Sequence, residues 1–105
     1  MKDVKVHKYS IRVDDFEYFS KVVVSHIRNY TIPQYGDAPH DQIQNWTPEQ
    51  CMDSIKRYVN RFSSNRRGRI EQLRDLAKIA HLAAIIFDKL EPEQEEIDKI
   101  EEGRS

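Results

Sequence analysis

Residues 47–90 decide the fold of this chain, with the sequence TPEQCMDSIKRYVNRFSSNRRGRIEQLRDLAKIAHLAAIIFDKL. The stretch begins with a capping box, because Thr47 offers an N-cap oxygen, Pro48 suits the first helical turn and Gln50 completes the box. The helix that follows carries apolar residues on one face, namely Cys51, Ile55, Tyr58, Val59 and Phe62. It is predicted to end at residues 63–65, whose side chains compete for backbone hydrogen bonds.

A second helix of this hairpin is predicted over residues 69–90. Its apolar stripe consists of Leu73, Leu76, Ala77, Ala80, Ala83, Ala84 and Phe87. Between Ile79 and Phe87 only His81 is polar, and a helix that is apolar nearly all round is typically buried on every side. Two other helices in a small domain can hardly cover such a segment, so we expect a homo-oligomer that assembles through Ile79–Phe87.

The flanking segments predict one more helix and little else. Tyr9, Ile11 and Val13 alternate with polar residues, which indicates a short strand or extended arm. Asp14 or Asp15 would then cap a helix whose apolar face is Phe16, Phe19, Val23, Ile27 and Tyr30. The segment TIPQYGDAPHDQIQNW (31–46) is predicted to be a long loop, and residues 91–105 a charged tail or short helix. The expected fold is therefore mainly α, a three-helix domain over residues 1–90 with a tail over 91–105.

Length and composition bound the class of protein. A chain of 105 residues with 38% apolar residues predicts one small domain that would gain from oligomerisation. Its one cysteine cannot form an intrachain disulfide, which fits a reducing compartment. The first ten residues lack a secretory pattern, and no stretch approaches the roughly 20 apolar residues of a membrane span. We expect a cytoplasmic protein with no membrane contact, located in the host cytoplasm if it is viral.

Charge is unevenly distributed along the chain. The formal net charge is −1, yet Lys56–Lys78 carries +6 and Asp88–Ser105 carries −5. A net charge near zero argues against a general nucleic-acid coat. Arg66, Arg67 and Arg69 lie in a predicted turn and not along a helical face that could enter a major groove, so nucleic acid is not an expected partner.

The basic turn is the main candidate for a binding site. Guanidinium groups match phosphate oxygens in pairs, and the start of a helix favours anions. The candidate phosphate ligands are Arg57, Arg61, Arg66, Arg67, Arg69 and Lys78, and the candidate base-stacking residues are Tyr35, Trp46 and Tyr58. The alternatives stay open: the arginines could form ion pairs with Glu71, Asp75 and the acidic tail, and Trp46 could pack before the Thr47 cap.

Other chemistries find less support in the sequence. The histidines at 7, 26, 40 and 81 lack metal-ligand spacing, and Cys51 lies on an apolar helical face. The three glycines form no phosphate-binding loop motif. We therefore expect no catalytic residue, no metal and no cofactor.

Two segments of the hairpin, IKRYVNRF (55–62) and LRDLAKIAHLAAIIFDKL (73–90), carry a resemblance to known families. Residues 46–90 resemble the small phage domains found beside nucleotide kinases, and also the short phage relatives of MazG-type all-α nucleotide pyrophosphohydrolases. The resemblance implies a phage origin and nucleotide handling, and it points to Tyr58, Arg61, Asp75 and Lys78. The magnesium-binding carboxylate pattern of MazG-type enzymes is not matched, since the first turns of the second helix of the hairpin offer only Glu71 and Asp75.

The basic turn and the stacking residues predict a ligand-binding protein, and the resemblance implies a phage accessory protein with a counter-defence role. It would bind and sequester a phosphate-bearing small molecule, a nucleotide or cyclic-nucleotide signal of bacterial defence, without cleaving it. The two alternatives are an enzyme of nucleotide metabolism, either a pyrophosphohydrolase or kinase-like, and a protein that inhibits a host defence component by direct contact.

Overall fold

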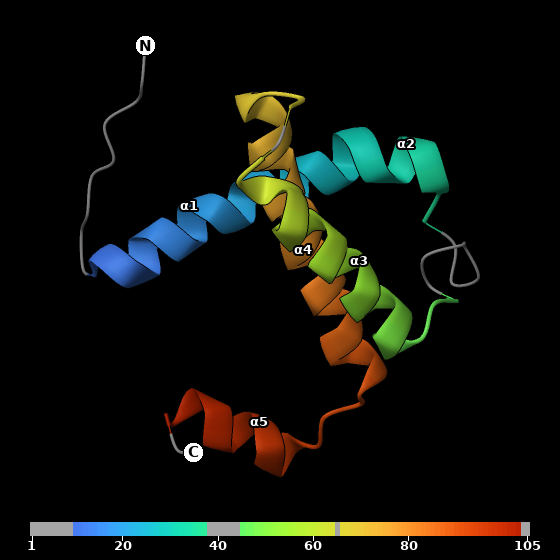
Figure 1. The fold of residues 1–105 in the computed structure, drawn as a ribbon. Helices are drawn as coiled ribbons and strands as arrows, with labels where there is room; N and C mark the ends of the chain where they lie inside the picture. Colours follow the sequence, from blue (N-terminus) through green and yellow to red (C-terminus); the bar gives the residue numbers. More distant parts are fainter. Residues whose placement is uncertain (1–9, 38–44, 65, 104–105) are drawn as a thin grey trace.

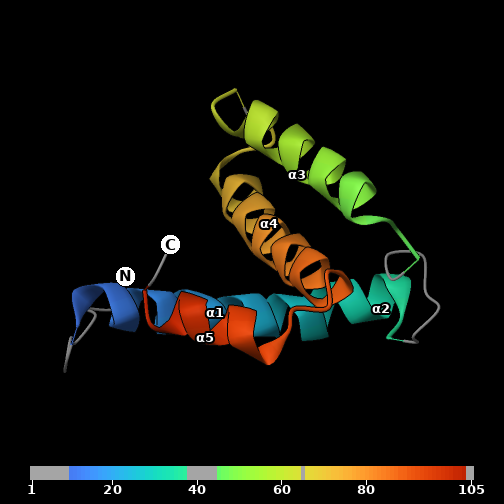
Figure 2. The ribbon, with the colours of Figure 1, turned by 90° about the horizontal axis from the view of Figure 1, so that it is seen from below.

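The computed structural model describes residues 10–37, 45–64 and 66–103, and it is mainly helical, as the sequence predicts. The elements are α1 (Ile11–His26), the π-helical turn η1 (Ile27–Thr31), α2 (Ile32–Tyr35), α3 (Pro48–Phe62), α4 (Arg69–Lys89) and α5 (Gln94–Glu101). Helices α3 and α4 form an antiparallel hairpin, α1 crosses α4, and α5 lies at the far end of α4 (Figures 1 and 2).

The hairpin begins as its capping residues predict. The backbone N–H of Gln50 donates to Thr47 Oγ1 over 3.1 Å, and the N–H of Thr47 donates to Gln50 Oε1 over 2.8 Å. These two bonds satisfy donors that the start of a helix otherwise leaves without a partner. The boundaries of α3 and α4 agree closely with the predicted ones, and Gly68, with φ of 95°, leads into α4.

The core lies between α3 and α4. Cys51 from α3 is fully buried against Leu82 and Ile85 from α4, with half-buried side chains around them, Trp46, Ile55, Tyr58 and Ile86. Val23 of α1 and Ala77 of α4 are also buried. Few apolar side chains are therefore withdrawn from water in the single chain.

The N-terminal prediction is wrong where it can be compared. Among the described residues there is no strand, and Ile11 and Val13 lie in the first turn of α1. Ser10 caps this helix, and neither Asp14 nor Asp15 does, because Ser10 Oγ accepts the N–H of Val13 over 3.2 Å. A period-two pattern of three residues is too short to outweigh a good N-cap. Tyr9 lies outside the described residues.

The predicted loop over residues 31–46 is also shorter than expected. The chain stays helical through η1 and α2 to Tyr35. The helix ends at Gly36, whose φ is 88°. Residues 38–44 lie outside the described part, and Thr47 is the N-cap of α3. For the charged C-terminal segment the sequence predicts either a tail or a short helix, and the structure contains the short helix α5. Glu93 and Glu96 form the capping box of this helix.

Most of the apolar stripe predicted for α4 does not face the core. Its member Ala77 is buried, but Leu73, Leu76 and Phe87 are between 38% and 50% exposed. The face toward α3 carries Asp75, Leu82 and Ile85, which are all buried. Helix α3 covers a different face of α4 because Arg61 of α3 pairs with Asp75 and Cys51 packs on Leu82 and Ile85. Within Ile79–Phe87, Leu82 and Ile85 are thus covered inside the chain, while Ala83, Ala84 and Phe87 stay exposed.

Candidate functional site

A pocket of about 130 Å³ lies where η1, α2, α3, α4 and the residues before α3 meet. Four aromatic side chains line it, and a lysine, a histidine, a threonine and a leucine complete the wall: Tyr30, Tyr35, Trp46, Tyr58, Lys78, His81, Thr31 and Leu82. We call it the aromatic pocket. Apolar and aromatic walls with a few convergent polar groups are typical of small-molecule sites.

The π-helical turn η1 sets one wall of this pocket. Pro33 has no N–H and its ring would clash with the carbonyl group four residues earlier, so a regular α-helix cannot pass through this position. The wider turn over Ile27–Thr31 absorbs the misfit, and the N–H of Ile32 donates to the carbonyl of Ile27. Tyr30 and Thr31 lie in this turn and both reach the pocket. Such single π-helical turns occur frequently at functional sites.

Lys78 is the cation of the pocket. Its ammonium nitrogen lies 5.3 Å from the ring centroid of Tyr30 and 5.6 Å from that of Tyr58, within the range of cation–π attraction. Burial lowers the pKa of Lys78, and nearby Asp75 and Glu71 oppose this shift. The ammonium group of Lys78 is therefore partly withdrawn from water among ring faces. A bound anion would stabilise its positive charge there.

A histidine supports the Tyr30 side of the pocket. The His26 ring stacks on Tyr30 with a centroid separation of 4.9 Å and an interplanar angle of 21°. Both ring nitrogens of His26 are buried without a hydrogen-bond partner in the described part of the chain. Burial, together with the charges of Lys78 and Arg74, lowers the pKa of His26. The imidazole therefore packs as a neutral ring and fixes the orientation of Tyr30.

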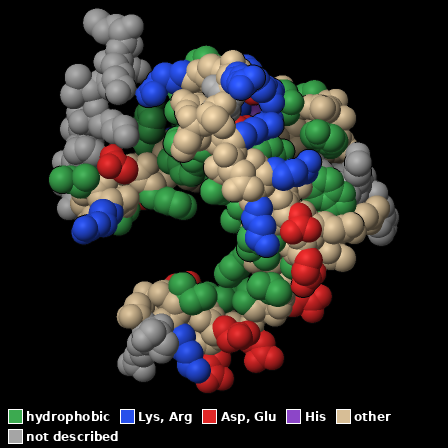
Figure 3. All heavy atoms as spheres, in the orientation of Figure 1, with side chains coloured by type: hydrophobic (Ala, Val, Ile, Leu, Met, Phe, Trp, Pro, Cys, Tyr) green, Lys and Arg blue, Asp and Glu red, His purple; other side chains and the backbone are tan. Residues whose placement is uncertain are grey.

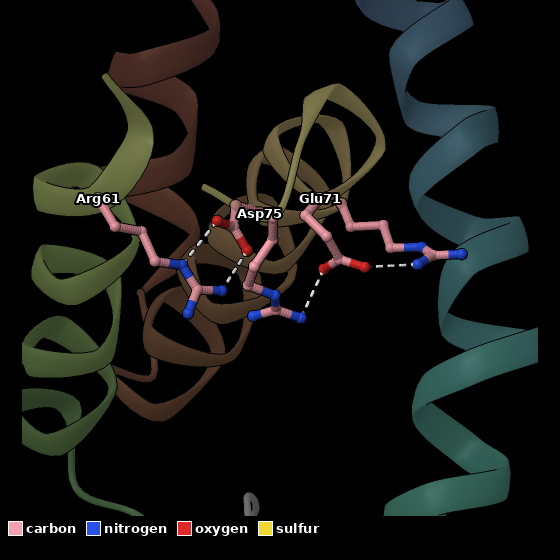
Figure 4. A network of polar contacts seen from close by, with 5 residues as sticks. Arg61, Glu71 and Asp75 are labelled. Carbon is pink, nitrogen blue, oxygen red and sulfur yellow. Dashed lines mark hydrogen bonds and ion pairs between the residues drawn. The ribbon is translucent and has the colours of Figure 1, made fainter. Parts of the chain in front are cut away.

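A buried ion pair holds α3 against α4 beside the pocket. Arg61 of α3 donates two hydrogen bonds to Asp75 of α4, Nε to Oδ2 over 2.8 Å and Nη2 to Oδ1 over 2.6 Å (Figure 4). The carboxylate is fully buried, and Arg61 lowers the pKa of Asp75. The guanidinium carbon of Arg61 also lies 4.9 Å from the ring centroid of Tyr58. One guanidinium group thus orients both Asp75 and a wall residue of the pocket.

The basic turn contains a second group of ion pairs. Glu71 accepts from Arg67 over 2.7 Å and from Arg74 over 2.6 Å, one guanidinium on each carboxylate oxygen (Figure 4). These bonds, that of Arg74 first, lower the pKa of Glu71. The alternative that the sequence left open, ion pairs within the cluster, therefore holds for Arg61 with Asp75 and for Arg67 with Glu71.

The structure brings together some of the predicted site residues. All three predicted stacking residues, Tyr35, Trp46 and Tyr58, line the same pocket, and Lys78 lies among them. Of the other candidate cations, Arg57 donates to Ser54 Oγ over 2.9 Å, and Arg66 and Arg69 are exposed at the turn before α4. The four positions indicated by the family resemblance lie close together: Arg61 binds Asp75 and lies near the Tyr58 ring, and Lys78 lies near the same ring.

Sequence reasoning missed the contribution of the first helical segment. Tyr30, Thr31 and His81 were not predicted to line a site, and the burial of Asp75 was not expected. Pro33 held the missing signal: a proline directly after a strong helical pattern can widen the last turn instead of ending the helix. For Asp75, the signal was Arg61, which lies on α3 and pairs with it.

Comparison with known proteins yields no relative: no family model, no curated protein and no solved structure matches the chain. Among the described residues, no group of three or more His, Cys, Asp or Glu side chains is placed to hold a metal ion. In the same residues, no helix is both long and apolar enough to span a bilayer.

Proposed function

We propose that this chain binds a phosphate-bearing small molecule with a flat ring, a nucleotide or cyclic nucleotide, and sequesters it without cleaving it. The observation that carries the proposal is Lys78, an ammonium group held between two tyrosine rings in a pocket with two further aromatic walls. A ring can stack on the aromatic faces while a phosphate oxygen accepts from the lysine.

The size of the pocket indicates how much of the ligand enters. A cavity of about 150 Å³ accommodates one benzene ring, and the aromatic pocket measures about 130 Å³. One ring therefore fits, and the sugar and further phosphates would lie at the mouth. Exposed Arg57, Arg66 and Arg69 would raise the local concentration of anions around the hairpin.

Binding without cleavage is supported by the state of the two carboxylates on α4. Both oxygens of Asp75 accept from Arg61, and the oxygens of Glu71 accept from Arg67 and Arg74. A carboxylate engaged in this way with guanidinium groups is a poor general base, because its pKa is lowered and each of its oxygens already accepts a hydrogen bond. The site offers positive charge and aromatic faces, which suit retention of an anion.

The biological setting of the proposal comes from the resemblance to phage nucleotide-handling domains. In a phage, a binder that retains its ligand would remove a nucleotide signal of bacterial defence, and it would act in the host cytoplasm. The aromatic pocket favours sequestration of a small molecule over direct inhibition of a host protein, because its ring faces line a concave site of the kind that binds small ligands.

The test is a thermal-shift and calorimetric screen with mono-, di-, tri- and cyclic nucleotides, with and without magnesium. A ligand at 100 times its Kd should raise the apparent free energy of unfolding by about 2.7 kcal/mol. The variants Lys78→Met and Tyr35→Leu should each weaken binding at least about tenfold, whereas Lys56→Met, an exposed lysine on α3, should not.

The recovered ligand decides between the candidate functions. An unchanged nucleotide after incubation supports sequestration, and a cleaved or phosphorylated one would move the protein to the class of enzymes. If no nucleotide shifts the melting temperature, the proposal is wrong, and the aromatic pocket is only an internal cation–π packing site.

A further inference from the structure

Helix α4 carries a second apolar face that the single chain leaves uncovered. Its members follow each other at alternating intervals of three and four residues: Leu73, Leu76, Ala80, Ala83, Phe87 and Leu90. A strict alternation of this kind is the narrow seam of a coiled coil, in which one helix packs against another along its whole length. We call these six residues the α4 seam.

The α4 seam is open to solvent in the single chain. Leu73, Leu76, Phe87 and Leu90 are between 38% and 67% exposed, and Ala83 is exposed as well. Figure 3 shows hydrophobic side chains over α1, α4 and α5 around an open hollow. Phe16 lies two turns before the buried Val23 on the same face of α1 and is 68% exposed, so α1 extends the apolar surface beyond α4.

We propose that a second copy of this chain packs on the α4 seam, with the two α4 helices antiparallel about a two-fold axis. In that register Leu73 faces Leu90 of the second copy, Leu76 faces Phe87, and Ala80 faces Ala83. Large residues meet large ones at both ends, and alanines at the centre let the helices approach closely. The same surface patch serves both copies, as a two-fold interface requires.

Charge selects the antiparallel orientation over the parallel one. The segment Lys56–Lys78, which leads into the seam, carries +6, and Asp88–Ser105, which follows it, carries −5. A parallel pair would place like charges side by side at both ends. The antiparallel pair brings the exposed arginines of the turn, Arg66 and Arg69, toward the acidic α5 of the second copy, which contains Glu95, Glu96 and Asp98. Arg66 and Arg69 would thereby face acidic residues of the second copy.

The oligomeric state of the full chain is the first test, measured by sedimentation equilibrium between about 1 and 100 μM. The wild type should be a dimer, and Ala83→Glu should dissociate it, with the dimer Kd raised at least about a hundredfold. Ala83 is an exposed helical position in the single chain, so this variant should keep its helical circular dichroism. Asn60→Asp, at an exposed position on α3 and with the same change in charge, is the matched control and should remain a dimer. A wild type that is monomeric at 100 μM would overturn the proposal.

Disulfide cross-linking tests the orientation. The one native thiol, Cys51, is fully buried, so introduced cysteines react alone. The double variant Leu73→Cys/Leu90→Cys should form a covalent dimer on mild oxidation. Leu73→Cys by itself should not, since an antiparallel pair separates the two copies of residue 73 by about 25 Å. Cross-linking of the single variant would refute the antiparallel arrangement. The proposal stands apart from nucleotide binding, which the calorimetric screen measures separately.

Discussion

Replacing Arg61 by alanine isolates the energetic role of the buried ion pair. The variant leaves the carboxylate of Asp75, which is 0% exposed, without the two hydrogen bonds of 2.6 and 2.8 Å that it now accepts. Breaking a buried pair by removing one partner typically costs about 3–5 kcal/mol. Because the Arg61 side chain is 36% exposed, water can reach part of the vacated space, and we expect the lower end, about 3 kcal/mol.

Urea denaturation at pH 7, followed by circular dichroism, measures this cost. The same substitution in an Asp75→Asn background should cost about 1 kcal/mol, because the side chain at position 75 then carries no charge for the guanidinium group to balance. Lys56→Ala, an exposed change on the same helix, should stay within about 0.5 kcal/mol and serves as the control. If Arg61→Ala costs the same in the wild-type chain and in the Asp75→Asn background, the reasoning is refuted.

The pH dependence of the same variant gives an independent check. Arg61 holds the pKa of Asp75 below its ordinary value of about 3.8, so the stabilisation is present above that pH and is lost as the pH falls through the lowered pKa. Without Arg61, burial raises the pKa of the carboxyl group instead. The cost of Arg61→Ala should therefore shrink as the pH falls, because Asp75 of the variant takes up a proton at a higher pH than Asp75 of the wild type.

Three further outcomes follow from single contacts. Burial and the charge of Lys78 lower the pKa of His26 below its ordinary 6.5, so the unfolded chain binds the proton more readily than the folded one. The free energy of unfolding should therefore fall as the pH drops below about 6.5. Urea titrations should show a smaller pH dependence for His26→Gln than for the wild type. Cys51 is fully buried and its thiol pKa is raised, so a thiol reagent such as Ellman's reagent should modify it at least about a hundredfold faster in urea than in the native state, and equal rates would contradict its burial. Thr47→Ala removes the N-cap acceptor of α3 and should cost about 1 kcal/mol in urea unfolding, whereas Thr47→Ser should cost much less.

The sequence predicted those parts of the fold that local chemistry determines. The capping box at Thr47 and the turn before Arg69 set the bounds of α3 and α4 correctly, because both signals act within one helical turn. The face that α4 presents to α3 was predicted wrongly. Apolar spacing alone favoured Leu73, Leu76 and Phe87, but the buried position of Asp75 depends on Arg61, fourteen residues earlier on another helix. A pairing of this kind becomes visible only when two elements are placed together.

The candidate site shows the same division between local and long-range information. The sequence indicates Tyr35 and Trp46 as stacking residues of the predicted loop and Tyr58 as a neighbour of Arg57 and Arg61, and all three line one pocket with Lys78. Tyr30 was assigned to a helical core face, and it reaches the pocket through the π-helical turn that Pro33 imposes. The predicted helix ends five residues before the observed end at Tyr35, so the prediction contains neither the π-helical turn nor α2.

Helix α4 therefore has three distinct faces, and this division makes the two proposals separable. One face holds Asp75, Lys78 and Leu82 toward α3 and the aromatic pocket, a second contains the buried Ala77, and the α4 seam remains open. Lys78 and Ala83 are five residues apart, which places them on opposite sides of the helix. We expect Lys78→Met to weaken nucleotide binding at least about tenfold without changing the sedimentation of the dimer. Ala83→Glu should dissociate the dimer while keeping the ligand affinity within about threefold. Loss of binding on dissociation, at protein concentrations where Ala83→Glu is folded, would instead show that the second copy completes the pocket.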